Sequence, residues 1–172
     1  LLPKPMQGGP TARLRPGKIE QGMKIMTETL AMLEQMDRYN RLKRESQTED
    51  RATVMAALKA CGITKVVIRY DGYGDSGGVE ECTVEGGQGQ ESLTVPVQTV
   101  ILDWSSAEKT IQMAPLRDVL ETLAMQYVAV EHSGWENNEG GSGDVTFDPI
   151  AGTITVSHTE NYVASEDFIH TY

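Results

Sequence analysis

The first part of the chain places apolar residues at a helical period. From Lys18 onward they are spaced alternately four and three positions apart, which is typical of a coiled-coil seam. The seam consists of Ile19, Met23, Met26, Leu30 and Leu33. It ends at Asp37, and a second apolar stripe on a shifted face continues to Leu42. We therefore expect one long amphipathic helix over residues 19–45, acting as a core or dimer helix.

A second, shorter helix is predicted directly after the first. Thr48 is expected to cap its start, and Gly62 to end it. Residues 1–18 contain four prolines and three glycines, which interrupt both helix and strand patterns. That stretch is expected to form an extended arm.

Farther along, the apolar positions alternate with a period of two, which predicts strands. We expect strands over residues 64–70, 79–85, 93–104, 145–147 and 154–158, with Ser105–Met113 as a turn and short extension and a third helix from Pro115 to about Gly134. Pro96 places the first half of the third strand at a sheet edge. The first two strands form one hairpin, and the last two form another.

These elements predict an α+β protein with a mainly antiparallel sheet of about five strands packed by helices. The expected organisation is an arm over residues 1–18, a long helix over 19–45 and an α+β domain over 46–172. No apolar run approaches the roughly 18 residues of a membrane span, and no secretory signal pattern is seen at the start. The expectation is a cytoplasmic protein without membrane contact.

Charge is divided unevenly along the chain. The net charge is -10, yet residues 1–69 hold 13 Lys or Arg against 7 Asp or Glu. From Tyr70 onward, only Lys109 and Arg117 face 18 carboxylates. Internal compensation explains such a division most simply. Otherwise the acidic part is suited to a cation or a basic protein, and the basic N-terminal part to nucleic-acid phosphates.

Two acidic, glycine-rich stretches stand out, Tyr70–Glu81 and Gly134–Asp144. We expect the first to be a long hairpin turn in which Asp71 and Asp75 bond to backbone N–H groups. The second connects the third helix to the last hairpin. If the hairpins are neighbours, the stretches converge and form an acidic cluster of Asp71, Asp75, Glu80, Glu136, Glu139 and Asp144.

Candidate site residues come from these stretches. For binding they are Asp71, Tyr73, Asp75, Glu80, Trp135, Glu136, Asn137, Asn138, Glu139 and Asp144. A hard cation such as Ca²⁺ or Mg²⁺ prefers oxygen ligands, and Asp71, Asp75 and Glu136 are its candidate ligands. The first stretch does not match an EF-hand loop, because its spacing is different. Trp135 is expected to pin its loop to the core, with an exposed recognition anchor as the alternative.

Both stretches resemble the motifs of an uncharacterised bacterial domain that also occurs on plasmids and phages. Its motifs are a strand ending in YDGxGDSG, matched by Tyr70–Gly77 and followed by Glu80 or Glu81, and a GWxNNxGG loop, matched by Gly134–Gly141. The resemblance covers about residues 50–172. It implies no activity.

Established catalytic motifs are missing from the sequence: there is no P-loop, no GxGxxG, no HExxH and no nucleophile elbow. His158 with Glu160 is the best acid–base pair available. Our leading hypothesis is a non-enzymatic binding module, of phage or mobile-element type, that engages a basic protein surface and self-associates through residues 19–45. A nucleic-acid mimic is a special form of it, and the alternative is a divalent-metal-dependent hydrolase or nuclease.

Overall fold

The computed structural model describes residues 16–172, and the predicted arm over residues 1–18 lies outside the description except for its last three residues. The chain divides into two compact units, Leu1–Arg41 and Leu42–Tyr172. In the first unit, the described residues form the beginning of helix α1. The second unit contains the rest of α1, all the strands and helix α2.

Helix α1 runs without a break from Pro16 to Ala60. The prediction of two separate helices is therefore wrong. Thr48, the expected cap, lies inside the helix, where its hydroxyl donates to the carbonyl of Arg44 at 2.9 Å. The helix ends at the predicted place, because Gly62 adopts a φ of 70° that favours glycine and its N–H donates to the carbonyl of Lys59.

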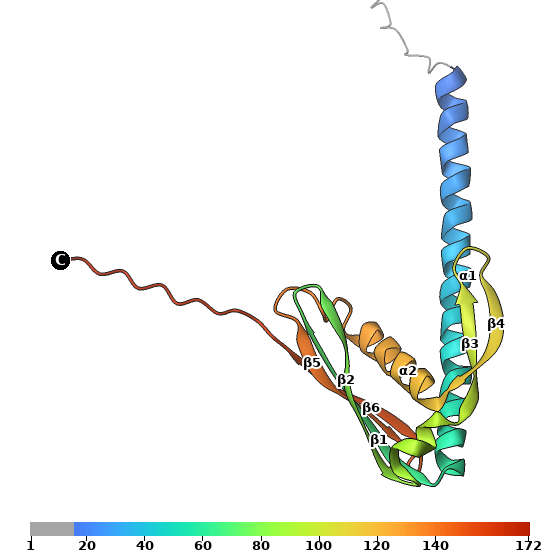
Figure 1. The fold of residues 1–172 in the computed structure, drawn as a ribbon. Coiled ribbons are helices and arrows are strands. Elements are labelled where there is room, and N and C mark those ends of the chain that lie inside the picture. The colour runs from blue at the N-terminus through green and yellow to red at the C-terminus, as the bar shows by residue number, and fades with distance from the viewer. Residues whose placement is uncertain (1–15) are drawn as a thin grey trace, which may run out of the picture. The chain divides into compact units, whose positions relative to one another are not determined.

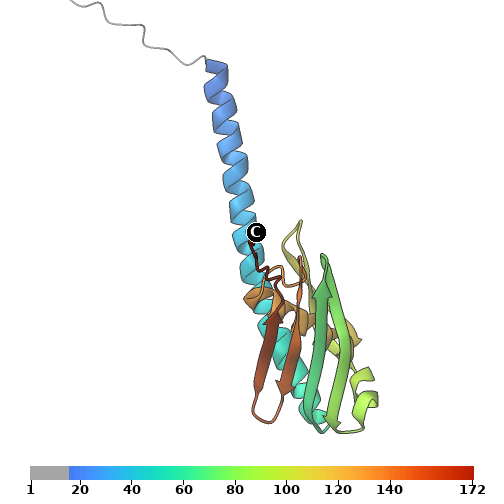
Figure 2. The ribbon, with the colours of Figure 1, turned by 90° about the vertical axis from the view of Figure 1, so that its left-hand side faces the viewer.

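Four antiparallel strands form the main sheet of the second unit, in the order β2-β1-β5-β6 (Figure 2). They are β1 (Ile63–Tyr73), β2 (Ser76–Gly86), β5 (Gly141–Asp148) and β6 (Thr153–Glu160). Both predicted hairpins, β1–β2 and β5–β6, are present, and β1 pairs with β5 at the centre. The hairpins are thus neighbours.

A second sheet consists of only two strands, β3 (Pro96–Asp103) and β4 (Glu108–Pro115). Residues 105–107 form the expected turn, but residues 108–113 belong to β4, so the expected short extension is a strand. This strand pairs with β3, and its Ile111 and Met113 side chains are exposed. Residues Gly89–Thr94 form a short 3-10 helix, so the strand expected from Leu93 begins at Pro96.

The core of the second unit lies between one face of the main sheet and two helical segments, α2 (Leu116–Glu131) and the last turns of α1 (Figure 1). Its fully buried members include Val54, Leu58, Val66, Ile68, Tyr70, Leu116, Leu120, Val145 and Phe147. The opposite face of the sheet carries the alternate, mainly polar residues of each strand. The α+β class with an antiparallel sheet is confirmed, and residues 16–172 contain six strands in two sheets.

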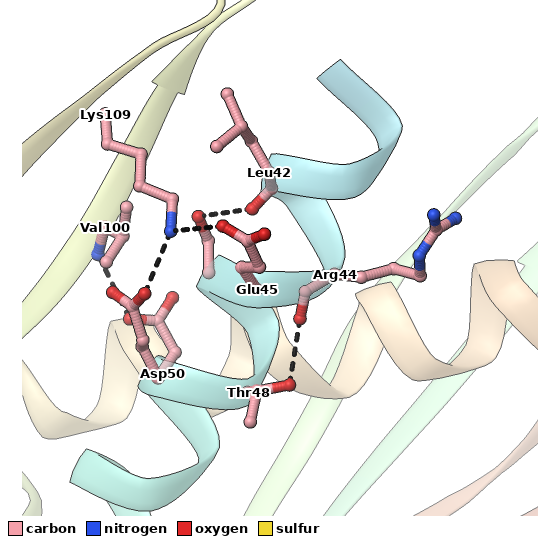
Figure 3. A network of polar contacts seen from close by, with 9 residues as sticks. Leu42, Arg44, Glu45, Thr48, Asp50, Val100 and Lys109 are labelled. Carbon is pink, nitrogen blue, oxygen red and sulfur yellow. Dashed lines mark hydrogen bonds and ion pairs between the residues drawn. The ribbon is translucent and has the colours of Figure 1, made fainter. Parts of the chain in front are cut away.

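Polar contacts hold the β3–β4 hairpin on the part of α1 that belongs to the second unit (Figure 3). Lys109 of β4 lies 3.3 Å from a carboxylate oxygen of Glu45 and 2.9 Å from one of Glu49. Asp50, which is buried, accepts hydrogen bonds from the backbone N–H of Val100 and the hydroxyl of Thr99. Burial raises the pKa of Asp50, and these two hydrogen bonds oppose the shift.

In the part of the chain that the structure describes, no helix is both long enough and apolar enough to cross a membrane.

Candidate functional site

The first glycine-rich stretch is almost entirely strand. Strand β1 continues to Tyr73 and β2 begins at Ser76, so only Gly74 and Asp75 form the turn. Both have positive φ, 60° and 69°, which is the geometry of a two-residue type I′ hairpin turn. The expected long turn with side-chain bonds from Asp71 and Asp75 is therefore wrong. Asp71 lies within β1, where it pairs with Ser142.

The second stretch packs directly against this hairpin tip. The N–H of Gly74 donates to the carbonyl of Asn138 at 3.0 Å, and the N–H of Asp75 donates to that of Glu136 at 3.1 Å. A Cβ on Gly140 would lie 1.7 Å from the carbonyl oxygen of Gly72. The two stretches thus meet, and backbone groups join them.

Trp135 lies beneath the tip and is partly buried against the core. A Cβ on Gly72 would lie 2.5 Å from the indole ring, and one on Gly77 would lie 2.4 Å from it. The two glycines face each other across β1 and β2, so they form a flat surface for the ring. The indole also packs edge-on against Tyr70, with 5.1 Å between the ring centroids. These contacts hold the loop of Trp135 against the core, which is the role that the sequence favoured for this residue.

The six carboxylates predicted to form one cluster are divided between several surroundings. Asp71, Glu80 and Asp144 line an open hollow of about 890 Å³ on the polar face of the main sheet. Glu139 lines a smaller hollow of about 270 Å³ with Asn137, Asn138 and Trp135. Asp75 and Glu136 lie where the two stretches are joined. Glu80 is the extra residue of a β-bulge, since Arg69 pairs with Glu81 but Tyr70 with Val79.

Arg69 is a site residue that the sequence reasoning missed. It lies between Glu81 of β2 and Asp144 of β5, at 3.3 and 3.5 Å respectively. One Asp144 carboxylate oxygen is buried without a hydrogen bond, so its interaction with Arg69 is electrostatic. The arginine offsets the charge of both partners. Asp144 therefore differs from the other predicted carboxylates.

We call the remaining five carboxylates the rim: Asp71, Asp75, Glu80, Glu136 and Glu139. Within residues 16–172, none of them forms an ion pair or a side-chain hydrogen bond. Tyr73, beside them at the tip, is 68% exposed. Asn137 and Asn138 are also exposed. Of the rim carboxylates, Asp71, Asp75 and Glu80 are exposed, and Glu136 and Glu139 are half-buried.

A group of aromatic residues beneath the rim was also missed. The hydroxyl of Tyr70 lies 2.7 Å from Nδ1 of His158, and the His158 ring stacks on that of His132 with centroids 4.0 Å apart. His158 is thus bonded to Tyr70 and not to Glu160, which was its expected partner. Burial lowers the pKa of His158, His132 lowers it further, and Glu160 opposes the shift. Burial likewise raises the pKa of Tyr70, with a smaller effect of Asp144.

Histidine, cysteine, aspartate and glutamate side chains are the usual protein ligands of metal ions. Across the described range, no three of them come together in an arrangement that could hold a metal ion. Asp71, Asp75 and Glu136 therefore do not form such a group there. Cys61 and Cys82 are free, and burial raises the pKa of the Cys82 thiol.

These features define an α+β domain with a joined, acidic hairpin tip. Residues 46–172 match the family described as "Family of unknown function (DUF6878)", and the chain belongs to that family. The matched range includes both glycine-rich stretches, and of α1 it includes only the part from residue 46 onward. Comparison with curated proteins and with solved structures finds no match.

Proposed function

We propose that the protein is a non-enzymatic binding module whose rim engages a basic surface of another protein. One observation carries the proposal: the backbone hydrogen bonds from Gly74 to Asn138 and from Asp75 to Glu136 join two acidic segments far apart in sequence. The backbones that carry Asp75 and Glu136 are therefore held side by side, while Asp71 and Glu80 line the larger hollow and Glu139 lines the smaller one.

Pre-organisation supports this function. A binding segment that is already ordered loses less conformational entropy when a partner binds. Here the turn has only two residues, and Trp135 fills the space beneath it. The carboxylates of Asp71 and Asp75 are thus attached to a backbone of fixed geometry.

Electrostatics supports it as well. Unpaired surface carboxylates create a negative potential that attracts a basic partner and speeds association. The rim carboxylates have no ion-pair partners within the described part of the chain, whereas Glu81 and Asp144 share Arg69. Charge on the rim is therefore available to a partner.

The test is binding of a short fluorescent peptide rich in lysine and arginine. The rim variant carries Asp71→Asn, Asp75→Asn, Glu136→Gln and Glu139→Gln together. We expect it to bind about tenfold or more weakly, since each exposed charge pair contributes roughly 0.2–1 kcal/mol. Binding by the native protein should also weaken as salt is added.

A matched control neutralises four exposed carboxylates elsewhere: Glu91, Glu108, Glu166 and Asp167. It changes the net charge by the same amount, so it separates the rim from charge in general. Equal loss of binding in the two variants, or no loss in the rim variant, would contradict the proposal.

The alternative, a divalent-metal-dependent hydrolase or nuclease, makes a different prediction. Ca²⁺, Mg²⁺ or Mn²⁺ bound at Asp71, Asp75 and Glu136 would raise the melting temperature. The binding-module proposal expects no such rise.

The motif resemblance is our reason for extending the binding-module proposal to a bacterial, plasmid or phage setting.

A further inference from the structure

The first unit exposes a long apolar face on α1. Seven Met, Leu and Ile side chains between residues 23 and 36 are each between 38% and 65% exposed: Met23, Ile25, Met26, Leu30, Met32, Leu33 and Met36. Soluble proteins seldom leave so many large apolar side chains together in water, and such a patch marks an interaction surface. This face is separate from the rim, which lies in the second unit.

The spacing on this face is that of a coiled coil. Met23, Met26, Leu30 and Leu33 follow one another at three, four and three positions, so they occupy the two core positions of a heptad on one side of a helix. Of the other exposed apolar residues, Met36 flanks this seam, and Ile25 and Met32 extend the apolar side farther round the helix. The opposite side carries polar and charged residues such as Lys24, Glu28 and Arg38.

The charge of the same segment favours a second copy as the occupant. Residues 16–41 contain four basic residues, Lys18, Lys24, Arg38 and Arg41, and four acidic ones, Glu20, Glu28, Glu34 and Asp37. A neutral helix does not repel its own copy, although the whole chain has a net charge of -10. A helix that lies on an anionic membrane normally carries an excess of Lys and Arg on its polar side, and this one does not.

We propose that the seam of α1 packs against the same segment of at least one further copy of this chain, forming a coiled coil. The apolar seam ends after Leu33, because polar residues, Asp37 and Asn40, occupy the next two core positions of the heptad. The unbranched Met side chains can adapt to the opposing helix. The assembly presents two or more rims at once, which would increase avidity for a partner with repeated basic sites.

The experiment is light scattering coupled to size exclusion on the full chain. The native protein should have a mass of at least twice the 18.9 kDa of one chain. Leu30→Glu places a charge in the seam and should give single chains, whereas the adjacent Ala31→Glu lies on the polar side and should leave the oligomer intact. Met26→Glu serves as a second seam variant, and circular dichroism confirms that each variant is folded.

Three outcomes would overturn the proposal. The native protein could have the mass of one chain at high concentration. Ala31→Glu could dissociate the oligomer as fully as the seam variants do. The native chain could instead bind vesicles of neutral and anionic lipid through α1 while remaining monomeric. None of these outcomes bears on the rim, so the two proposals are tested separately.

Discussion

The hydroxyl of Tyr70 and Nδ1 of His158 lie 2.7 Å apart, although 88 positions separate the two residues in the sequence. Strand β5 runs between them and has Gly143 at the position that pairs with both. A Cβ on Gly143 would lie 2.7 Å from the Tyr70 hydroxyl oxygen. The glycine therefore leaves the space that the pair occupies beneath the rim.

Removing this hydroxyl should destabilise the protein. Burial raises the pKa of Tyr70, so the phenol stays protonated and shares a hydrogen bond with Nδ1 of His158. Tyr70→Phe leaves Nδ1 of His158 without its hydrogen-bond partner, which costs about 1–3 kcal/mol in the free energy of unfolding. Tyr127→Phe is the control, since the Tyr127 hydroxyl forms no hydrogen bond within residues 16–172. Urea unfolding measures both, and equal losses would show that the Tyr70 bond contributes nothing.

Stability should depend on pH through His158. Its pKa in the folded protein lies below the ordinary 6.5, mainly because burial disfavours the charged ring. The unfolded chain therefore takes up the proton first, and the free energy of unfolding falls as the pH drops below about 6.5. His158→Gln should make this dependence shallower. Unfolding followed at several pH values tests it, and identical slopes for the native protein and the variant would refute it.

A methyl group at Gly77 should displace Trp135. The added carbon would lie 2.4 Å from the indole, so Gly77→Ala should cost about 1–3 kcal/mol of stability. The neighbouring Gly78 has open space around its Cβ position and no positive φ, which makes Gly78→Ala a matched control with little loss. Thermal unfolding compares the two variants. If both melt at the same temperature, Trp135 does not hold the tip as described.

The sequence predicted local features well, because hydrophobic period and turn residues determine them. The β1–β2 and β5–β6 hairpins and the end of α1 at Gly62 were found in this way. Thr48 was misjudged because a hydroxyl that caps a helix can equally bond to a carbonyl one turn earlier inside it. Strand β4 was missed because its outward side chains are exposed and give a weak pattern.

The candidate site was predictable only in part. Glycine and acidic residues marked both segments, but the order β2-β1-β5-β6 decides which side chains meet. Arg69 is flanked by Glu81 and Asp144 for that reason, and Tyr70 reaches His158 across a third strand. Such pairs depend on strand order and register, which no local pattern contains.

Our central claim is that the joined tip forms one surface for a basic partner. The most direct test is to titrate ¹⁵N-labelled protein with the lysine- and arginine-rich peptide and to follow the backbone amide resonances. We predict that the largest shifts fall in residues 71–81 and 134–144 together, and that they disappear in the rim variant. Shifts spread over other acidic segments such as residues 160–167, or confined to only one of the two stretches, would contradict the claim.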